Sequence, residues 1–114
     1  MNLNNRDNCI PFTTKDYSTI REILHANNQS LAEAIVSPGQ STAPHYHRKS
    51  EEIYYILHGQ GTMLLAEQEL SVTRGDAVLI PAGTRHSICN SGENDLVFLC
   101  CCAPGYSHED TVLC

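Results

Sequence analysis

The chain is poor in basic side chains, and it lacks both a membrane-length apolar run and an export signal. Seven Lys and Arg stand against 13 Asp and Glu in 114 residues, a formal net charge of −6. Nucleic acids and anionic membrane surfaces select basic patches, so neither is an expected partner. No stretch approaches the roughly 20 apolar residues that cross a bilayer, and residues 1–7 lack the basic-then-apolar layout of a secretion signal. We therefore expect a cytoplasmic protein.

Internal repeats, low-complexity segments and linkers are also absent. A chain of this length can bury one modest core but not two. We expect a single domain over residues 1–114, with loosely ordered tails at both ends.

The cysteines do not indicate a disulfide framework, because no export signal accompanies them. Residues 96–102 have the pattern of a strand, in which neighbouring side chains point to opposite faces. Cys101 should therefore point away from Cys100 and Cys102. We interpret these thiols as small buried side chains of a reduced protein, with a second metal site or a redox switch as the alternative. The six are Cys9, Cys89, Cys100, Cys101, Cys102 and Cys114.

Short apolar or alternating runs recur after residue 30, and Gly, Pro, Asn and Asp separate them. This spacing predicts an all-β fold, a small antiparallel sandwich or barrel, and the lack of long helical periods argues against a parallel βαβ sheet. Residues 17–24 fit a helical face or a short strand equally well. The expected strands are 31–36, 51–57, 62–65, 69–72, 77–80, 85–89 and 96–102.

Three histidines and one glutamate have the spacing of a metal site. His45 and His47 are two residues apart, so an extended strand points both imidazoles to one face. Glu52 opens the next strand, where Glu51 should face the opposite way. His86 follows the tight turn at residues 81–83 and reaches the site from a third segment.

Imidazole and carboxylate donors suit one divalent transition metal, namely Fe, Mn, Ni, Co or Zn. Four protein donors would leave an octahedral ion two open positions for Lewis-acid or oxygen chemistry. Ligation requires neutral imidazoles, so affinity should fall as the pH drops towards about 6. Tyr54 shares the Glu52 face and is a candidate catalytic acid or hydrogen-bond donor; the alternative, which its position slightly favours, is a core tyrosine of the barrel wall.

The spacing of these four residues, together with the glycines, proline and asparagine around them, resembles both motifs of the cupin superfamily. The first reads Gly39, five residues, His-X-His, four residues, Glu52, six residues, Gly59. The second runs from Gly75 through Pro81, Gly83 and His86 to Asn90. The resemblance implies a double-stranded β-helix, or jelly roll, with a core over about residues 31–104. It also implies that His45, His47, Glu52 and His86 ligate the metal, that Gly39, Gly59, Gly75, Pro81 and Gly83 form turns, and that Asn90 is structural.

The resemblance further implies a metal-dependent enzyme acting on a small oxygen-rich molecule. Dioxygenase, decarboxylase, lyase and isomerase chemistry all occur on this fold, and the fold does not choose among them. The alternative is a non-catalytic module that binds or senses a small molecule or the metal. Cupins commonly pair through strand or sheet contacts, so a homodimer is expected.

Overall fold

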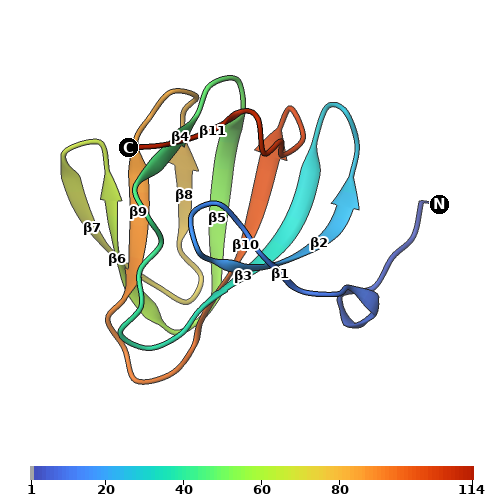
Figure 1. Cartoon of the computed structure of the whole chain (residues 1–114). Helices are drawn as coiled ribbons and strands as arrows, with labels where there is room; N and C mark the ends of the chain where they lie inside the picture. Colours follow the sequence, from blue (N-terminus) through green and yellow to red (C-terminus); the bar gives the residue numbers. More distant parts are fainter. Residues whose placement is uncertain (1) are drawn as a thin grey trace.

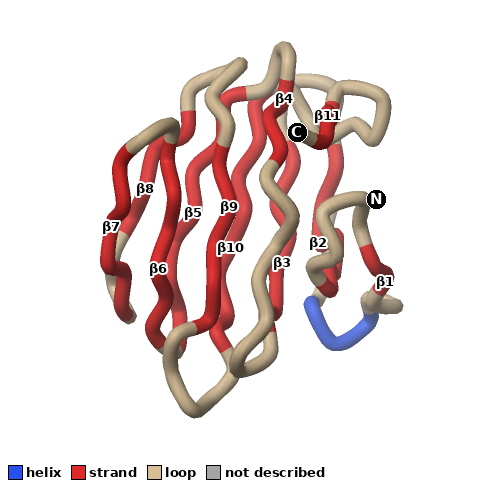
Figure 2. The backbone as a smooth tube through the Cα atoms, turned by 60° about the vertical axis from the view of Figure 1, so that its left-hand side comes forward, coloured by secondary structure: helices blue, strands red, loops and turns tan. Residues whose placement is uncertain are grey.

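Two antiparallel β-sheets face one another in the computed structural model, which describes residues 2–114 (Figure 1, Figure 2). The predicted all-β class is confirmed. A 3-10 helix, η1 (Arg6–Asn8), precedes the strands. The first sheet has the order β1 (Phe12–Thr13), β2 (Thr19–His25), β3 (Ser30–Val36), β10 (Leu96–Ala103), β5 (Glu51–His58) and β8 (Ala77–Ile80). The second has the order β11 (Thr111–Leu113), β4 (His45–His47), β9 (His86–Asn90), β6 (Gln60–Leu65) and β7 (Gln68–Thr73).

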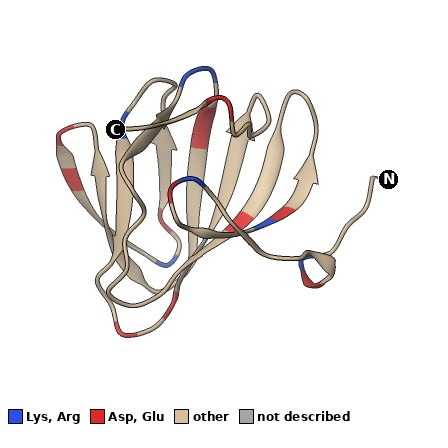
Figure 3. Cartoon of the chain, viewed as in Figure 1, with Lys and Arg blue, Asp and Glu red and all other residues tan. Residues whose placement is uncertain are grey.

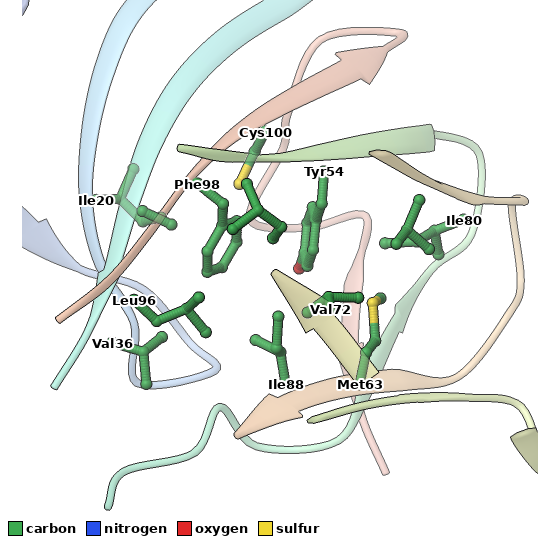
Figure 4. Close-up of a cluster of buried hydrophobic side chains, with 13 residues drawn as sticks. Ile20, Val36, Tyr54, Met63, Val72, Ile80, Ile88, Leu96, Phe98 and Cys100 are labelled. Atoms are coloured by element: carbon green, nitrogen blue, oxygen red, sulfur yellow. The ribbon is translucent and has the colours of Figure 1, made fainter. Parts of the chain in front are cut away.

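The core lies between the two sheets and follows from alternation along the strands. In β5 the odd-numbered positions Ile53 and Tyr55 face outward, whereas Tyr54 and Ile56 are buried. In β10 Phe98 is buried in the same way. Side chains from both sheets meet there (Figure 4). Burying such side chains is the main favourable contribution to folding, at about 1.5–3 kcal/mol for each fully buried one.

The predicted strands after residue 30 agree with the observed ones to within two residues at each end. The ambiguous segment 17–24 forms most of β2, which pairs with β3 along most of its length and with β1. Pairing with β3 decides between the two patterns, because it buries Ile20 and leaves Leu24 exposed. A helix would have placed both on one face.

The ends of the chain contain strands that the sequence did not indicate. β1 and β2 form a hairpin at one edge of the first sheet, and β11 pairs with β4 at the edge of the second. The tails expected to be loosely ordered therefore contribute two edge strands. Lys15, in the β1–β2 turn, joins them, since its Nζ donates to the carbonyl oxygens of His108 and Thr111 at 3.2 and 3.0 Å.

Lysine and arginine positions fall on short, separate segments of the ribbon (Figure 3). Within residues 2–114 no helix has the length and apolarity needed to cross a membrane.

Candidate metal centre

The four residues singled out by spacing converge from three strands of the two sheets. β4 supplies His45 and His47, and β9 supplies His86, which lies directly opposite His45 in the pairing of the two strands. One nitrogen from each of the three rings falls within 4.8 Å of the others. Glu52 enters from β5 in the facing sheet, and all four side chains are buried. Glu51, its neighbour in sequence, is exposed.

Each imidazole is held by a hydrogen bond on its outer nitrogen. Nδ1 of His45 donates to the carbonyl oxygen of Ala43 at 2.7 Å, and Nδ1 of His86 donates to that of Thr84 at 2.9 Å. A carbonyl oxygen can only accept, so both rings carry their proton on Nδ1. Nε2 then presents a lone pair toward the site, which is the tautomer that metal ligation requires.

His47 is oriented by a chain of two hydrogen bonds from the C-terminal strand. The Thr111 hydroxyl donates to the carbonyl oxygen of Ser107 at 3.0 Å, so its oxygen remains free to accept. Nδ1 of His47 lies 3.0 Å from that oxygen and donates to it. The Nε2 lone pair of this third ring therefore also faces inward. Sequence reasoning missed Thr111, because nothing in a polar tail marks it as a partner of His47.

The Glu52 carboxylate lies among these nitrogens. Its Oε1 is 3.2 Å from Nε2 of His47 and 3.5 Å from Nε2 of His86. Burial by itself would raise the pKa of Glu52, but when no metal is bound and His47 and His86 are protonated on Nε2, their hydrogen bonds and positive charge outweigh burial and lower that pKa to about 2. The carboxylate is therefore ionised across the physiological range.

The thiol of Cys102 donates to the other oxygen of Glu52, Oε2, at 3.3 Å. Burial and the neighbouring carboxylate raise the pKa of Cys102 well above its usual value, so it remains a protonated donor. The alternation predicted for residues 100–102 agrees with the structure, in which Cys100 and Cys102 are buried. The expectation that Cys101 is also buried is wrong, because it lies on the outer face of β10 and is exposed. Cys102 thus contacts a candidate ligand and does not complete a separate thiolate site.

Three inward-facing atoms of this cluster have no hydrogen-bond partner within residues 2–114: Nε2 of His47, Nε2 of His86 and Oε1 of Glu52. Buried polar atoms are normally satisfied, and an unsatisfied one costs about 1–3 kcal/mol. A shared cation would satisfy all three together, and nitrogen and carboxylate oxygen are the donors that divalent transition metals accept. The residues present therefore fit the metal that the motif implies.

Tyr54 lies beside the cluster, on the core side. Its ring packs 4.5 Å from that of Phe98 and 5.9 Å from that of His86, measured between centroids. Burial raises the pKa of Tyr54 well above its usual value, and the charge on Glu52 adds to this effect. The phenol is neutral and can act only as a hydrogen-bond donor or acceptor at ordinary pH.

A second carboxylate reaches the site from the β1–β2 turn. Oδ2 of Asp16 lies 3.3 Å from Nε2 of His45. No motif or periodicity includes this residue, since it arrives through the path of the hairpin. A cavity of about 40 Å³ lies between Asp16, the candidate ligands and an apolar wall that includes Phe12 and Phe98. Within residues 2–114, no lysine or arginine lines it.

A protein-family model described as the cupin domain matches residues 32–102 of this chain. The match covers more than half of the sequence, and the protein belongs to the cupin family. The jelly-roll, or double-stranded β-helix, class predicted from the two motifs is thereby confirmed.

Individual known proteins are also similar to this chain. An uncharacterised protein of Methanocaldococcus jannaschii is 52% identical over 110 residues, covering 92% of this chain and 88% of that protein. The oxalate-binding protein of Thermotoga maritima is 35% identical over 79 residues, covering 69% of this chain and 65% of that protein. The crystal structure of a predicted oxalate decarboxylase from Thermotoga maritima superposes with a TM-score of 0.80 at 25% identity, covering 90% of this chain and 98% of the other.

Proposed function

We propose that this cupin binds one divalent transition metal through His45, His47, His86 and Glu52 and uses it to act on a small oxygen-bearing organic molecule. The three buried atoms without hydrogen-bond partners carry this proposal. The tautomers support it as well, because each ring directs a lone pair to the same point. Fe, Mn, Ni, Co and Zn all suit this donor set.

A bound ion would supply Lewis-acid or redox chemistry to a ligand in its open positions. The protein's own contribution is positional. Glu52 provides the one negative charge among the four ligands, and the Cys102 thiol fixes its orientation from behind. The neutral Tyr54 phenol, beside His86, is the candidate donor to a ligand oxygen. The name of the oxalate-binding relative supports an oxygen-bearing ligand in general, without fixing which one.

The alternative is a binding or sensing module without turnover. The cavity of about 40 Å³ beside the candidate ligands supports a small ligand for either function. Both functions require the metal, and they differ in whether a bound ligand is transformed.

The test begins with metal content. Protein purified without added metal, and protein loaded with each of the five ions, is measured by elemental analysis. His86→Ala should lose most of the metal, whereas His58→Ala, at an exposed position, should retain it. Oxygen uptake and product formation are then screened with phenolic, keto-acid and thiol substrates. Protein that binds none of the five ions would rule out both functions, and equal metal content in the two variants would show that the ligand set is wrong.

We also propose that the chain forms a homodimer through the outer face of its first sheet. Ile53 and Leu79 are adjacent there across β5 and β8, and 44% and 55% of their surfaces are exposed. Tyr55 continues the same apolar face at 43%. Light scattering after size exclusion should give twice 12.6 kDa for the wild type and a monomer for Leu79→Glu; a wild-type monomer contradicts the proposal.

All six cysteines are free thiols. This supports a reducing compartment, and we propose the cytoplasm.

A further inference from the structure

Asp16 is held in one orientation by the turn that carries it. Its Oδ1 accepts hydrogen bonds from the backbone N–H of Ser18 at 3.1 Å, from the Ser18 hydroxyl at 2.7 Å and from the Thr14 hydroxyl. These donors fill one oxygen and direct the other, Oδ2, toward His45. The side chain is buried although it lies in a connecting turn. The turn is itself tied down, because Lys15 donates to two carbonyl oxygens of the C-terminal segment.

The contact between Oδ2 of Asp16 and Nε2 of His45 has no obvious donor. His45 uses its Nδ1 proton on Ala43, so in the neutral ring Nε2 can only accept, as can a carboxylate. Two acceptors 3.3 Å apart repel one another unless a positive centre lies between them, either a proton on Nε2 or a metal ion. Two donors that bind one ion at about 2.1 Å, at right angles, are about 3.0 Å apart. The separation of these two atoms therefore fits two ligands of one ion. Binding of all five donors together requires Asp16 and Glu52 to shift toward the other rings, because neither carboxylate has an oxygen within 4.8 Å of all three ring nitrogens.

We propose that Asp16 is a fifth protein donor to the metal, supplied by the β1–β2 turn, and that it restricts the site to small ligands bound through a single atom. This inference rests on the metal site proposed above. Five protein donors leave an octahedral ion one open position where the cupin motifs alone would leave two. A bidentate ligand such as oxalate must then displace Asp16.

The formal charge of the proposed site also disfavours a dianion such as oxalate. A divalent ion with Glu52 and Asp16 has a formal net charge of zero. Within residues 2–114, neither Lys nor Arg lines the cavity to attract an anion, and Glu22 adds a further carboxylate to the lining. A dianion entering this space would be repelled. We therefore infer that the ligand class is uncharged or singly charged.

The experiment compares Asp16→Asn with Glu22→Gln in protein loaded with Co²⁺, whose visible absorption depends on its coordination. Asn keeps an oxygen acceptor for Thr14 and Ser18 but removes the charged donor. Glu22→Gln removes the other lining carboxylate and leaves Asp16 in place. Oxalate, a bidentate dianion, and azide, a ligand that binds through one atom, are titrated into each protein by calorimetry and by absorption.

We expect Asp16→Asn to change the Co²⁺ spectrum, to weaken Co²⁺ binding and to raise oxalate affinity by about 10–100-fold. Azide affinity should rise by less than oxalate affinity, because azide needs only one position. Glu22→Gln should leave the spectrum unchanged and shift both affinities slightly and equally. An unchanged spectrum and an unchanged oxalate affinity in Asp16→Asn would overturn the inference. Equal effects of the two substitutions would also overturn it, since charge alone would then explain the result.

Two further measurements keep the outcomes distinguishable. If Asp16→Asn does not fold, Ser18→Ala replaces it; losing one donor to Oδ1 should loosen the carboxylate and raise oxalate affinity partway, and no rise in a folded Ser18→Ala counts against the inference. Wild-type protein that binds no Co²⁺ refutes the metal site itself. Wild-type protein that binds Co²⁺ but also binds oxalate as tightly as Asp16→Asn refutes the role of Asp16 alone.

Discussion

Removing the metal should lower the melting temperature by an amount that the unsatisfied atoms of the site explain. Without an ion, Nε2 of His47, Nε2 of His86 and Oε1 of Glu52 are buried without hydrogen-bond partners. At about 1–3 kcal/mol each, they cost the folded chain about 3–9 kcal/mol. An ion that bridges them removes this cost, so metal binding and folding are coupled.

The size of the shift follows from mass action. Free ion at 100 times its dissociation constant stabilises the folded state by about 2.7 kcal/mol, which is within what the three atoms can supply. One kcal/mol moves the melting temperature of a domain of this length by about 4 °C. The loaded protein should therefore melt about 10 °C above protein treated with a chelator.

Thermal unfolding followed by circular dichroism measures the shift, with the chelator removed before each ion is added back. His86→Ala should lose the shift, because it removes one donor and leaves the others unable to enclose the ion. His58→Ala, at the exposed end of β5, should keep it. A wild-type melting temperature that none of Fe, Mn, Ni, Co and Zn raises would contradict the metal site, as would a response of His86→Ala as strong as that of the wild type.

Three further predictions concern acid stability, the orientation of the carboxylate and a turn. The pKa of Glu52 falls from 4.5 to about 2 on folding. Its ionised form therefore stabilises the metal-free protein above pH 4.5, and this contribution is lost as the pH falls from 4.5 toward 2. The melting temperature of Glu52→Gln should depend less on pH over that range than the melting temperature of the wild type. Cys102→Ala should weaken metal affinity by about tenfold, whereas Cys101→Ala, on the outer face, should leave it unchanged in the same titration. Gly59→Ala should cost about 2–5 kcal/mol, since it combines left-handed strain with a Cβ only 2.6 Å from a backbone oxygen. Gly75→Ala meets no atom within 4 Å and should cost only about 1–2 kcal/mol in urea unfolding; equal losses would contradict the steric argument.

The fold and the four candidate ligands could be predicted because their signals are local. The period of two in residues 51–57 separates Glu52 from Glu51 without knowledge of the partner strand. The same period places His45 and His47 on one face. The turn residues divide the chain into strands of the observed length, so the antiparallel class follows from spacing alone.

The remaining parts of the site depend on which distant segments meet, and spacing does not encode that. Asp16 reaches His45 because the turn between the paired strands β1 and β2 carries it there, and Thr111 reaches His47 because β11 pairs with β4. Alternation predicted that Cys102 and Cys101 face opposite ways, but the hydrogen bond of Cys102 to Glu52 depends on the register between β10 and β5. Residues 17–24 fit two periods equally well until pairing with β3 selects the strand.

The motif residues and Asp16 lie on different parts of the chain, so the two parts of the site can be changed separately in protein engineering. The candidate ligands of the motifs lie on β4, β5 and β9, whereas Asp16 lies in the turn of a short edge hairpin. Exchanging residues 12–18 is therefore expected to change the charge beside the candidate ligands while the strands that carry those ligands keep their pairing.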